Sequence, residues 1–331
     1  MGRAAGVAAD PADIQQGAEM HVVIAGGVGA ARFLKGLVRV VPPEEILAVV
    51  NVGDDLWLHG LRICPDLDSI TYHLAGVVDP DRQWGRAEET EVVATELERF
   101  GSSRWFTLGD RDLATHLHRT ERLRAGVPLS VVADEIREAF GVEVRLVPAT
   151  DDEAETRILT SDGRDLHFQD YWVREGGRPE VAEVDLRAAR QAQAAPGTVE
   201  ALLSADAVLI APSNPVVSVD PVRTVPAIAA ALHQTPAPVV GVSPIVGGSV
   251  VRGMAHRLLP AVGAEVSAAG VARYYGEVLD GWVLDERDAG QAAAVERLGV
   301  TARVTDTMMD DVEVAAALAA TTVELAAELR T

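Results

Sequence analysis

The sequence predicts an α/β fold: a Rossmann-like parallel sheet with helices on both faces and an inserted α+β cap. Three observations indicate this class. Short apolar runs with few alternating polar residues recur along the chain, as in strands that are buried on both faces. Segments with helical spacing separate these runs. The runs also end in loops rich in glycine or polar residues, and ligands of open parallel sheets bind at such loops.

The fold is predicted to begin with a strand at 21–25, followed by a glycine-rich turn at 26–29 and a helix over 32–40. A second strand is predicted at 46–50, and polar residues follow it, starting with Asn51. This order of strand, turn, helix and strand is typical of a parallel sheet.

The middle of the chain predicts a helix from about 88 to 100, a short strand at 105–108 and helices to about 140. Between 142 and 181 the strand-like pieces are short and polar, with a hairpin signal at 161–163. We therefore expect an inserted subdomain at about 120–195. Buried strands return at 207–211 and 239–242, and an alanine-rich amphipathic helix follows near the C-terminus. Residues 1–20 are expected to be a flexible N-terminal tail and residues 21–331 a single domain.

Composition excludes several classes of protein. With 48% hydrophobic residues among 331, the chain is not disordered by composition. A net charge of −21 repels phosphate backbones and anionic lipids, so we expect neither nucleic acid nor a membrane as a partner. The single cysteine, Cys64, excludes an internal disulfide and favours the cytoplasm. No apolar run approaches the roughly 20 residues that span a bilayer, and residues 1–20 lack the pattern of a secretion signal.

The turn Gly26-Gly27-Val28-Gly29 is the first candidate site. Its backbone N–H groups and the following helix N-terminus can approach a phosphate, because glycine has no Cβ. A plain strand-to-helix connection is the alternative. Arg32 stands where a dinucleotide-binding loop has its third glycine, and Asn51 stands where an acidic residue would hold a ribose. Both departures argue against an NAD enzyme, and the loop also lacks the lysine of a P-loop.

Four carboxylates, Asp54, Asp55, Asp66 and Asp68, fall within 15 positions. Mg²⁺ usually takes one or two carboxylates together with substrate phosphates, so this group beside a phosphate loop suits a metal-bridged diphosphate. The alternative is structural: Asp54 caps a turn, and Asp66 or Asp68 caps the helix that starts near Ser69.

Two further groups of polar residues are candidates. In the first, 109–116, Arg111 suits a phosphate or a planar ring and Asp110 could cap the helix that carries His116, while a solvated ion-pair turn is the alternative. The second group, 212–215 and 243–245, follows buried strands. Its polar atoms could recognise a nucleobase or sugar, or could serve ordinary turn chemistry.

Taken together, seven blocks resemble the 2-phospho-L-lactate transferase family of deazaflavin coenzyme F-420 biosynthesis. The resemblance covers the chain from about residue 21 to the C-terminus, and the arginine- and alanine-rich composition looks like the actinobacterial, phosphoenolpyruvate transferase-like branch. The blocks are GGVGAARF (26–33), NVGDDLW (51–57), CPDLD (64–68), LGDRDLATH (108–116), HFQDYWVR (167–174), APSNPVVS (211–218) and SPIVGG (243–248).

The resemblance implies a Mg²⁺-dependent enzyme, often a homodimer, with a guanosine diphosphate-linked donor. The enzyme would transfer a phosphoenolpyruvyl or 2-phospho-L-lactyl group to the terminal ribityl hydroxyl of the deazaflavin Fo (7,8-didemethyl-8-hydroxy-5-deazariboflavin). GMP would leave, and (dehydro) coenzyme F-420-0 would form. The enolpyruvyl donor is favoured, although the sequence does not decide between the two.

The same resemblance implies roles for individual residues. The guanosine phosphates would be held by Gly26, Gly27, Gly29, Ser213, Asn214 and Ser243. Mg²⁺ would be carried by Asp54 and Asp68. The deazaflavin or the moving phosphoryl group would face Arg62, Asp66, Asp110, Arg111 and His116, and Asp55 is also expected to bind substrate. Because phosphoryl transfer depends on alignment and charge neutralisation, Asp54, Asp68 and Arg111 are expected to matter most for catalysis.

A non-catalytic nucleotide-binding regulator with a related Rossmann-like fold is the alternative function. Such a protein would keep the glycine loop, but it has no reason to gather aspartates at the same edge of the sheet. The sequence therefore favours the transferase.

Overall fold

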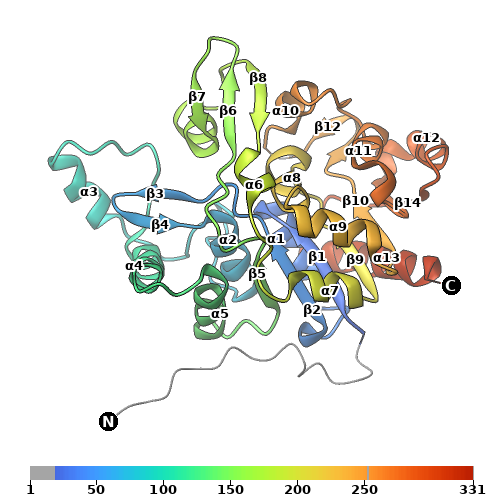
Figure 1. Cartoon of the computed structure of the whole chain (residues 1–331), viewed down its shortest axis with the longest axis horizontal. Coiled ribbons are helices and arrows are strands. Elements are labelled where there is room, and N and C mark those ends of the chain that lie inside the picture. Colours follow the sequence, from blue (N-terminus) through green and yellow to red (C-terminus); the bar gives the residue numbers. More distant parts are fainter. Residues whose placement is uncertain (1–18, 252, 331) are drawn as a thin grey trace.

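The central sheet of the computed structural model, which describes residues 19–251 and 253–330, has seven parallel strands and confirms the α/β prediction (Figure 1). In spatial order the strands run β14-β13-β10-β9-β1-β2-β5. Their bounds are β1 (His21–Ala25), β2 (Ile46–Val50), β5 (Arg145–Pro148), β9 (Ala207–Ile210), β10 (Val239–Val242), β13 (Gly281–Asp285) and β14 (Thr301–Thr305).

The order of the strands reverses at β1. This strand pairs with β2 on one side, where His21 lies opposite Ile46, and with β9 on the other, where His21 lies opposite Ala207. Right-handed crossovers that leave such a point in opposite directions place their helices on opposite faces of the sheet. The loops after β1 and β9 therefore lead to helices on opposite faces, and open α/β sheets bind ligands beyond the strand ends at such a point.

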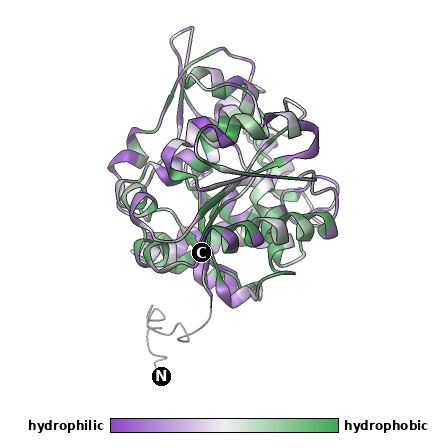
Figure 2. Ribbon diagram, turned by 90° about the vertical axis from the view of Figure 1, so that its right-hand side faces the viewer, coloured by the Kyte–Doolittle hydropathy of each residue, from purple (hydrophilic) through white to green (hydrophobic). Residues whose placement is uncertain are grey.

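Helices cover both faces of the sheet. On one face, α1 (Gly27–Leu37) packs between α2 (Pro65–Leu74) and α13 (Val312–Leu329), while α7 (Thr198–Ser204) and α9 (Pro226–Gln234) lie across the other face (Figure 1). The strands between these layers are the hydrophobic centre of the molecule (Figure 2). All residues of β1, β2, β9 and β10 are buried, and each buried aliphatic side chain of this kind contributes about 1.5 to 3 kcal/mol to folding.

Two segments are inserted between strands of the main sheet. The segment between β2 and β5 holds a hairpin and four helices: β3 (Leu56–Leu58), β4 (Leu61–Ile63), α2, α3 (Val92–Arg99), α4 (Asp110–Arg124) and α5 (Leu129–Ala139). The segment after β5 holds an antiparallel sheet that projects at the top of Figure 1, made of β6 (Arg157–Thr160), β7 (Asp165–His167) and β8 (Val181–Asp185). The hairpin predicted at 161–163 joins β6 and β7.

The range predicted for the inserted subdomain, about 120–195, does not follow the boundaries of the observed elements. That range begins inside α4 and includes β5, which pairs with β2 in the main sheet. The physical reason is that β5 is a short edge strand with two half-buried positions, so its sequence resembles that of the polar strands in the insertion.

The remaining elements lie mostly in the C-terminal half. They are α6 (Arg187–Gln191), α8 (Asp220–Arg223), α10 (Ala255–Ala261), α11 (Ala268–Tyr275), α12 (Ala292–Glu296) and the small hairpin of β11 (Ile245–Val246) and β12 (Ser249–Val250). Among the described residues, no single helix is long and apolar enough to cross a membrane. One strongly bent pair, Pro215–Arg223 with Pro226–Gln234, passes that test by length and composition alone.

Other local predictions differ from the structure. Residues 105–108 form no strand. The guanidinium carbon of Arg174 lies over the Trp105 ring, 4.2 Å from the ring centroid. The helix expected over 32–40 begins earlier, at Gly27. Most of the predicted tail, residues 1–18, lies outside the described residues. At its end, the Met20 N–H donates to Asp206 Oδ2 (2.8 Å).

Asp285 anchors the C-terminal end of β13. Its carboxylate accepts hydrogen bonds from the backbone N–H groups of Arg287 and Thr307 and from the Thr307 hydroxyl. Burial by itself raises the pKa of Asp285, but these hydrogen bonds outweigh it and hold the pKa below its ordinary value. The contact fixes the loop after β14, which carries Thr307 into the cavity described below.

Candidate active site

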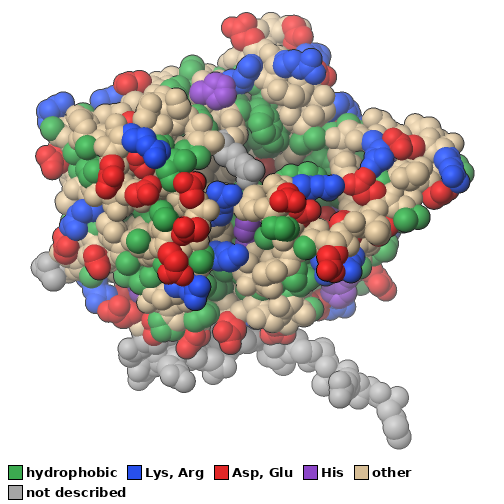
Figure 3. All heavy atoms as spheres, turned by 180° about the vertical axis from the view of Figure 1, so that it is seen from behind, with side chains coloured by type: hydrophobic (Ala, Val, Ile, Leu, Met, Phe, Trp, Pro, Cys, Tyr) green, Lys and Arg blue, Asp and Glu red, His purple; other side chains and the backbone are tan. Residues whose placement is uncertain are grey.

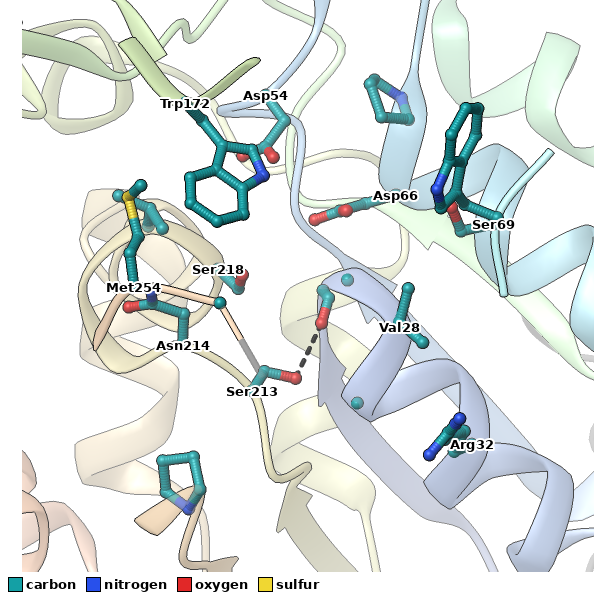
Figure 4. A pocket seen from close by; sticks show the side chains of 18 of the residues that line it. Val28, Arg32, Asp54, Asp66, Ser69, Trp172, Ser213, Asn214, Ser218 and Met254 are labelled. Atoms are coloured by element: carbon teal, nitrogen blue, oxygen red, sulfur yellow. Dashed lines mark hydrogen bonds between the residues drawn. The ribbon is translucent and has the colours of Figure 1, made fainter. Parts of the chain in front are cut away.

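A cavity of about 520 Å³ opens beyond the carboxyl ends of the central strands, where the loops after β1, β2, β9 and β10 meet (Figure 4). The molecular surface is hollowed here, below the projecting sheet of β6–β8 (Figure 3). The structure brings together at this cavity most of the residues that the sequence singled out: Gly26, Gly27, Gly29, Asp54, Asp66, Asp68, His116, Ser213, Asn214 and Ser243.

The glycine turn is closely packed against the loop after β9. A Cβ on Gly29 would lie 2.2 Å from the carbonyl oxygen of Pro212, and Gly27 has a φ of +68°, in the left-handed region that favours glycine. The Ser213 hydroxyl donates to the Gly26 carbonyl oxygen (2.7 Å), as Figure 4 shows. This packing sets the N-terminus of α1 at the cavity, where its N–H groups and dipole favour an anion; the Gly27 N–H already interacts with the Asp66 carboxylate.

Asn51 joins two carboxylates on the wall of the cavity. Its amide nitrogen donates to Asp54 Oδ1 (3.0 Å) and to Asp66 Oδ2 (2.8 Å). Gln169, which follows β7 in the inserted sheet, donates to the second oxygen of Asp54 (3.1 Å). The Asn51 side-chain oxygen accepts from the Gly53 N–H (2.8 Å), so the amide cannot turn away. Asp54 and Asp66 are thus held side by side, and we call them the carboxylate pair.

The electrostatics of the carboxylate pair favour a bound cation. Burial raises the pKa of Asp66 to about 6. Burial and the neighbouring charge of Asp66 raise the pKa of Asp54 well above its usual range. The described residues hold no group of three or more histidine, cysteine or acidic side chains arranged for a metal ion. Two carboxylates nevertheless fit Mg²⁺, which commonly completes its coordination with substrate phosphates and water.

Asp68, the other predicted metal ligand, has a different partner. Both of its oxygens accept hydrogen bonds from the guanidinium of Arg119 on α4, one of them at 3.1 Å from Nη1. Arg119 is almost completely buried and does not line the cavity, and sequence reasoning missed it. The signal was present, because residues 112, 116 and 119 have the spacing of one helix face.

Asp112 is a second cavity residue that sequence reasoning left without a role. Its carboxylate accepts a hydrogen bond from the Tyr72 hydroxyl (2.5 Å), and its other oxygen lies 3.3 Å from His116 Nε2, without the alignment of a full hydrogen bond. Although burial raises the pKa of Asp112, the His116 ring and the Tyr72 hydroxyl hold it below its ordinary value. Asp112 therefore presents an ionised carboxylate to the cavity at neutral pH.

Two predicted site residues, Asp55 and Arg62, lie behind the cavity and do not line it. They form a buried ion pair, with 3.5 Å between Arg62 Nη2 and Asp55 Oδ2. Burial raises the pKa of Asp55 to about 7, even though Arg62 opposes the shift. The Asp55 carbonyl oxygen also lies 3.1 Å from His167 Nε2. This contact between Asp55 and His167 connects the β3–β4 hairpin to the inserted sheet.

Asp110 and Arg111 lie at the start of α4, outside the residues that line the cavity. Asp110 accepts from the N–H groups of Val92 and Val93, so it caps α3 and not its own helix. Glu89 in turn accepts from the N–H groups of Arg111 and Asp112 and caps α4. The Arg111 side chain is half exposed and lies 3.4 Å from Glu88. The structure does not bring Asp110 and Arg111 to the carboxylate pair.

Asn214 and Ser243, which follow β9 and β10, line the cavity, but their side-chain oxygens have partners within their own loops. Asn214 accepts from the Val216 N–H (3.0 Å), and the Ser243 hydroxyl donates to the Ile245 carbonyl oxygen (3.0 Å). These residues shape the loops, and backbone groups beside them remain the candidates for contact with a ligand.

Aromatic side chains form the outer wall of the cavity. Trp84 and Trp172 line it and are 46% and 38% exposed, and the Arg82 guanidinium lies over the Trp84 ring, 5.5 Å from the ring centroid. Phe106 and Phe168 lie deeper. Planar ligands stack on such faces, so the cavity offers aromatic surface as well as charged groups.

Comparison with known proteins agrees with this geometry. Residues 22–324 match the family model described as 2-phospho-L-lactate transferase CofD. A phosphoenolpyruvate transferase of Streptomyces griseus is 46% identical over 314 residues, which cover 93% of this chain and 99% of that protein. One of Mycolicibacterium smegmatis is 43% identical over 324 residues, which cover 92% and 98%.

A solved structure shows the same fold. It is a member of the UPF0052 family from Bacillus halodurans, with a TM-score of 0.62 and 18% identity, covering 93% of this chain and all of that one. The family match spans most of the chain and includes the loops that build the cavity. The chain therefore belongs to the 2-phospho-L-lactate transferase family.

Proposed function

We propose that this transferase moves a phosphoenolpyruvyl group from a guanosine diphosphate-linked donor to the terminal ribityl hydroxyl of the deazaflavin Fo. The acceptor oxygen forms a bond to the phosphorus that carries the three-carbon acid, and the bond from that phosphorus to GMP breaks. The hydroxyl proton goes to solvent, and dehydro coenzyme F-420-0 and GMP are the products. The names of the relatives, phosphoenolpyruvate transferases, support the enolpyruvyl donor over the lactyl one.

The donor phosphates fit the side of the cavity where α1 begins. The start of α1 offers backbone N–H groups there, and Arg32 and Arg82 line the same cavity. These groups supply the local positive potential that a chain of net charge −21 needs in order to bind a diphosphate. Ser213 contributes by fixing the glycine turn in place.

Mg²⁺ would be held by Asp54 and Asp66, and when bound it would neutralise charge on the donor phosphates. This pair differs from the predicted Asp54 and Asp68, because Arg119 already occupies both oxygens of Asp68. Asn51 and Gln169 orient the Asp54 oxygens, so the chain itself positions the ligands.

The acceptor fits the aromatic wall of the cavity. Trp84 and Trp172 offer faces on which a deazaflavin ring can stack. Asp112, ionised at neutral pH and held by Tyr72, would accept a hydrogen bond from the ribityl hydroxyl and orient its oxygen. Alignment of this kind is the main contribution that a protein makes to phosphoryl transfer.

The observation that carries the proposal is the meeting of the glycine turn and the carboxylate pair in one cavity of a chain from this family. The test is to incubate the protein with Fo, Mg²⁺ and either the enolpyruvyl or the lactyl diphosphoguanosine, and to follow GMP and the product by mass spectrometry. We expect GMP release that depends on both Fo and Mg²⁺ and is faster with the enolpyruvyl donor.

The inactive variant for comparison is Asp54→Asn, which keeps the size of the side chain and removes its charge. We expect it to lose turnover by orders of magnitude while keeping the folded circular dichroism spectrum. Absence of GMP from both donors with the unmodified protein would contradict the proposal. The homodimer and the cytoplasmic location stay predictions.

A further inference from the structure

Arg119 is a buried cation with no place in the proposed chemistry. It is 1% exposed, stands on α4 and does not line the cavity. Its guanidinium donates to both oxygens of Asp68, and its Nη1 lies 3.2 Å from His116 Nδ1. Asp68 and His116 both line the cavity, so Arg119 connects two of its side chains from behind.

We propose that Arg119 is a positioning residue for the cavity side chains of α2 and α4. It holds Asp68 directly and orients Asp112 through the imidazole of His116. The proposal rests on the proposed function, since Asp112 is the group assigned to orient the acceptor hydroxyl. It adds a residue that acts on that carboxylate from outside the cavity.

The geometry fixes the proton of His116. A guanidinium only donates hydrogen bonds, so Nδ1 of His116 must accept from Arg119. The ring proton then sits on Nε2, which lies 3.3 Å from Asp112 Oδ2. A proton on Nδ1 would set an N–H group against the guanidinium, although Nδ1 also lies 3.7 Å from Asp68 Oδ2. Arg119 therefore favours one tautomer, which sets the ring N–H beside Asp112 without the alignment of a full hydrogen bond.

The titratable and charged groups around Arg119 come from both inserted helices and from the hairpin before them. Asp68 and Tyr72 come from α2, His116 and Asp112 from α4, and Arg62 from β4; the Arg62 backbone oxygen lies 3.4 Å from Arg119 Nη1. Asp55, ahead of β3, and Cys64, ahead of α2, also interact with its charge. A buried ion pair is often no more stabilising than apolar residues of the same volume. Stability alone thus gives little reason for a guanidinium at this position, whereas orienting two cavity side chains requires its several donors.

The first experiment reads the tautomer of His116 in the unmodified protein by long-range ¹H–¹⁵N correlation of the histidine rings. His116→Gln assigns the signal among the eight histidines of the chain. We expect a ring that carries its proton on Nε2 and none on Nδ1. A proton on Nδ1 would overturn the proposal. This measurement needs no substrate, so it stands or fails separately from the proposed function.

The second experiment compares Arg119→Lys and Arg119→Met with Arg122→Met. Arg122 lies one turn further along α4 and pairs with Glu135 (2.6 Å), outside the cavity, which makes it the matched control. We expect Arg119→Met to lower kcat by about 10- to 100-fold with little change in KM for the donor. Arg119→Lys should recover part of the rate, and Arg122→Met should stay within about 2-fold of the unmodified protein.

A purely structural role gives a different result. Arg119→Met would then lower the melting temperature but leave kcat per folded molecule unchanged, and the His116 tautomer would not move. That outcome, or an equal loss of kcat in Arg122→Met, would overturn the positioning role. If the unmodified protein releases no GMP, the proposed function fails, and the tautomer measured in Arg119→Met still decides whether Arg119 orients the ring.

Discussion

Replacing Asn51 by aspartate tests the carboxylate pair, because the substitution exchanges one NH₂ group for an oxygen and keeps the shape of the side chain. In the native chain that NH₂ group donates to Asp54 at 3.0 Å and to Asp66 at 2.8 Å. It also donates to the Val217 carbonyl oxygen at 3.1 Å, so in Asn51→Asp all three contacts become oxygen against oxygen. A stabilising bridge between two carboxylates is thereby turned into a third negative charge beside them.

The size of the effect follows from these distances. Two unit charges about 3 Å apart repel by roughly 5.5 kcal/mol at an effective dielectric constant of 20. Uptake of a proton limits the penalty, at about 1.4 kcal/mol for each unit by which the pKa must rise. We therefore expect Asn51→Asp to lower the free energy of unfolding by about 3 to 5 kcal/mol at neutral pH.

The assay is urea unfolding followed by circular dichroism, in a buffer with a metal chelator. The control is Asn214→Asp, at the only other asparagine of the chain. There the side-chain oxygen accepts from the Val216 N–H, which an aspartate does equally well, so the loss should stay within about 0.5 kcal/mol. A loss below about 1 kcal/mol in Asn51→Asp would show that Asp54 and Asp66 are not held together as described.

Three further substitutions test other parts of the structure. Gly29→Ala places a Cβ 2.2 Å from a backbone oxygen, so we expect the free energy of unfolding in urea to fall by about 1 to 3 kcal/mol and the KM for the donor to rise. Gly290→Ala is the control and should be neutral, because no atom lies within 4 Å of its added Cβ. Equal behaviour of the two variants would refute the close packing of the turn. Trp172→Ala should raise the KM for Fo by about 3- to 10-fold, and Trp57→Ala, outside the cavity, should not; an unchanged KM in the first variant excludes stacking on this ring. The folded-state pKa of Asp285 is lowered, so its carboxylate contributes stability above its unfolded pKa of about 4 and loses it as the pH falls further. Asp285→Asn should therefore be less stable at neutral pH, with a deficit that disappears in acid unfolding curves below about pH 4, and a deficit independent of pH would contradict the assignment.

The fold was predictable where strands are buried on both faces. The runs 21–25, 46–50 and 239–242 coincide with β1, β2 and β10, because a fully buried strand needs apolar residues at every position. β14, at the edge of the sheet, has only half-buried and exposed residues and gave no such signal. The aromatic residues of 105–108 suggested a strand, but they pack as a loop on the side chains around them.

The candidate site was predictable where it follows from strand order. Loops after parallel strands meet at one edge, so Asp54 and Ser213 could be placed together before any coordinates. Partners from the inserted segments could not. Arg119 looks like any other arginine on a polar helix, and Gln169 reaches Asp54 only because the segment after β7 lies against the loop after β2. Such contacts depend on tertiary packing that local sequence patterns do not encode.

The exchanged caps of α3 and α4 limit how this region can be redesigned. Glu89, ahead of α3, closes the start of α4, and Asp110, on α4, closes the start of α3. Trimming the stretch before α3 to make a smaller enzyme would therefore leave open N–H groups on the helix that bears Arg119. A shortened protein would need a new acceptor grafted at the position of Glu89 before the deletion could be tolerated.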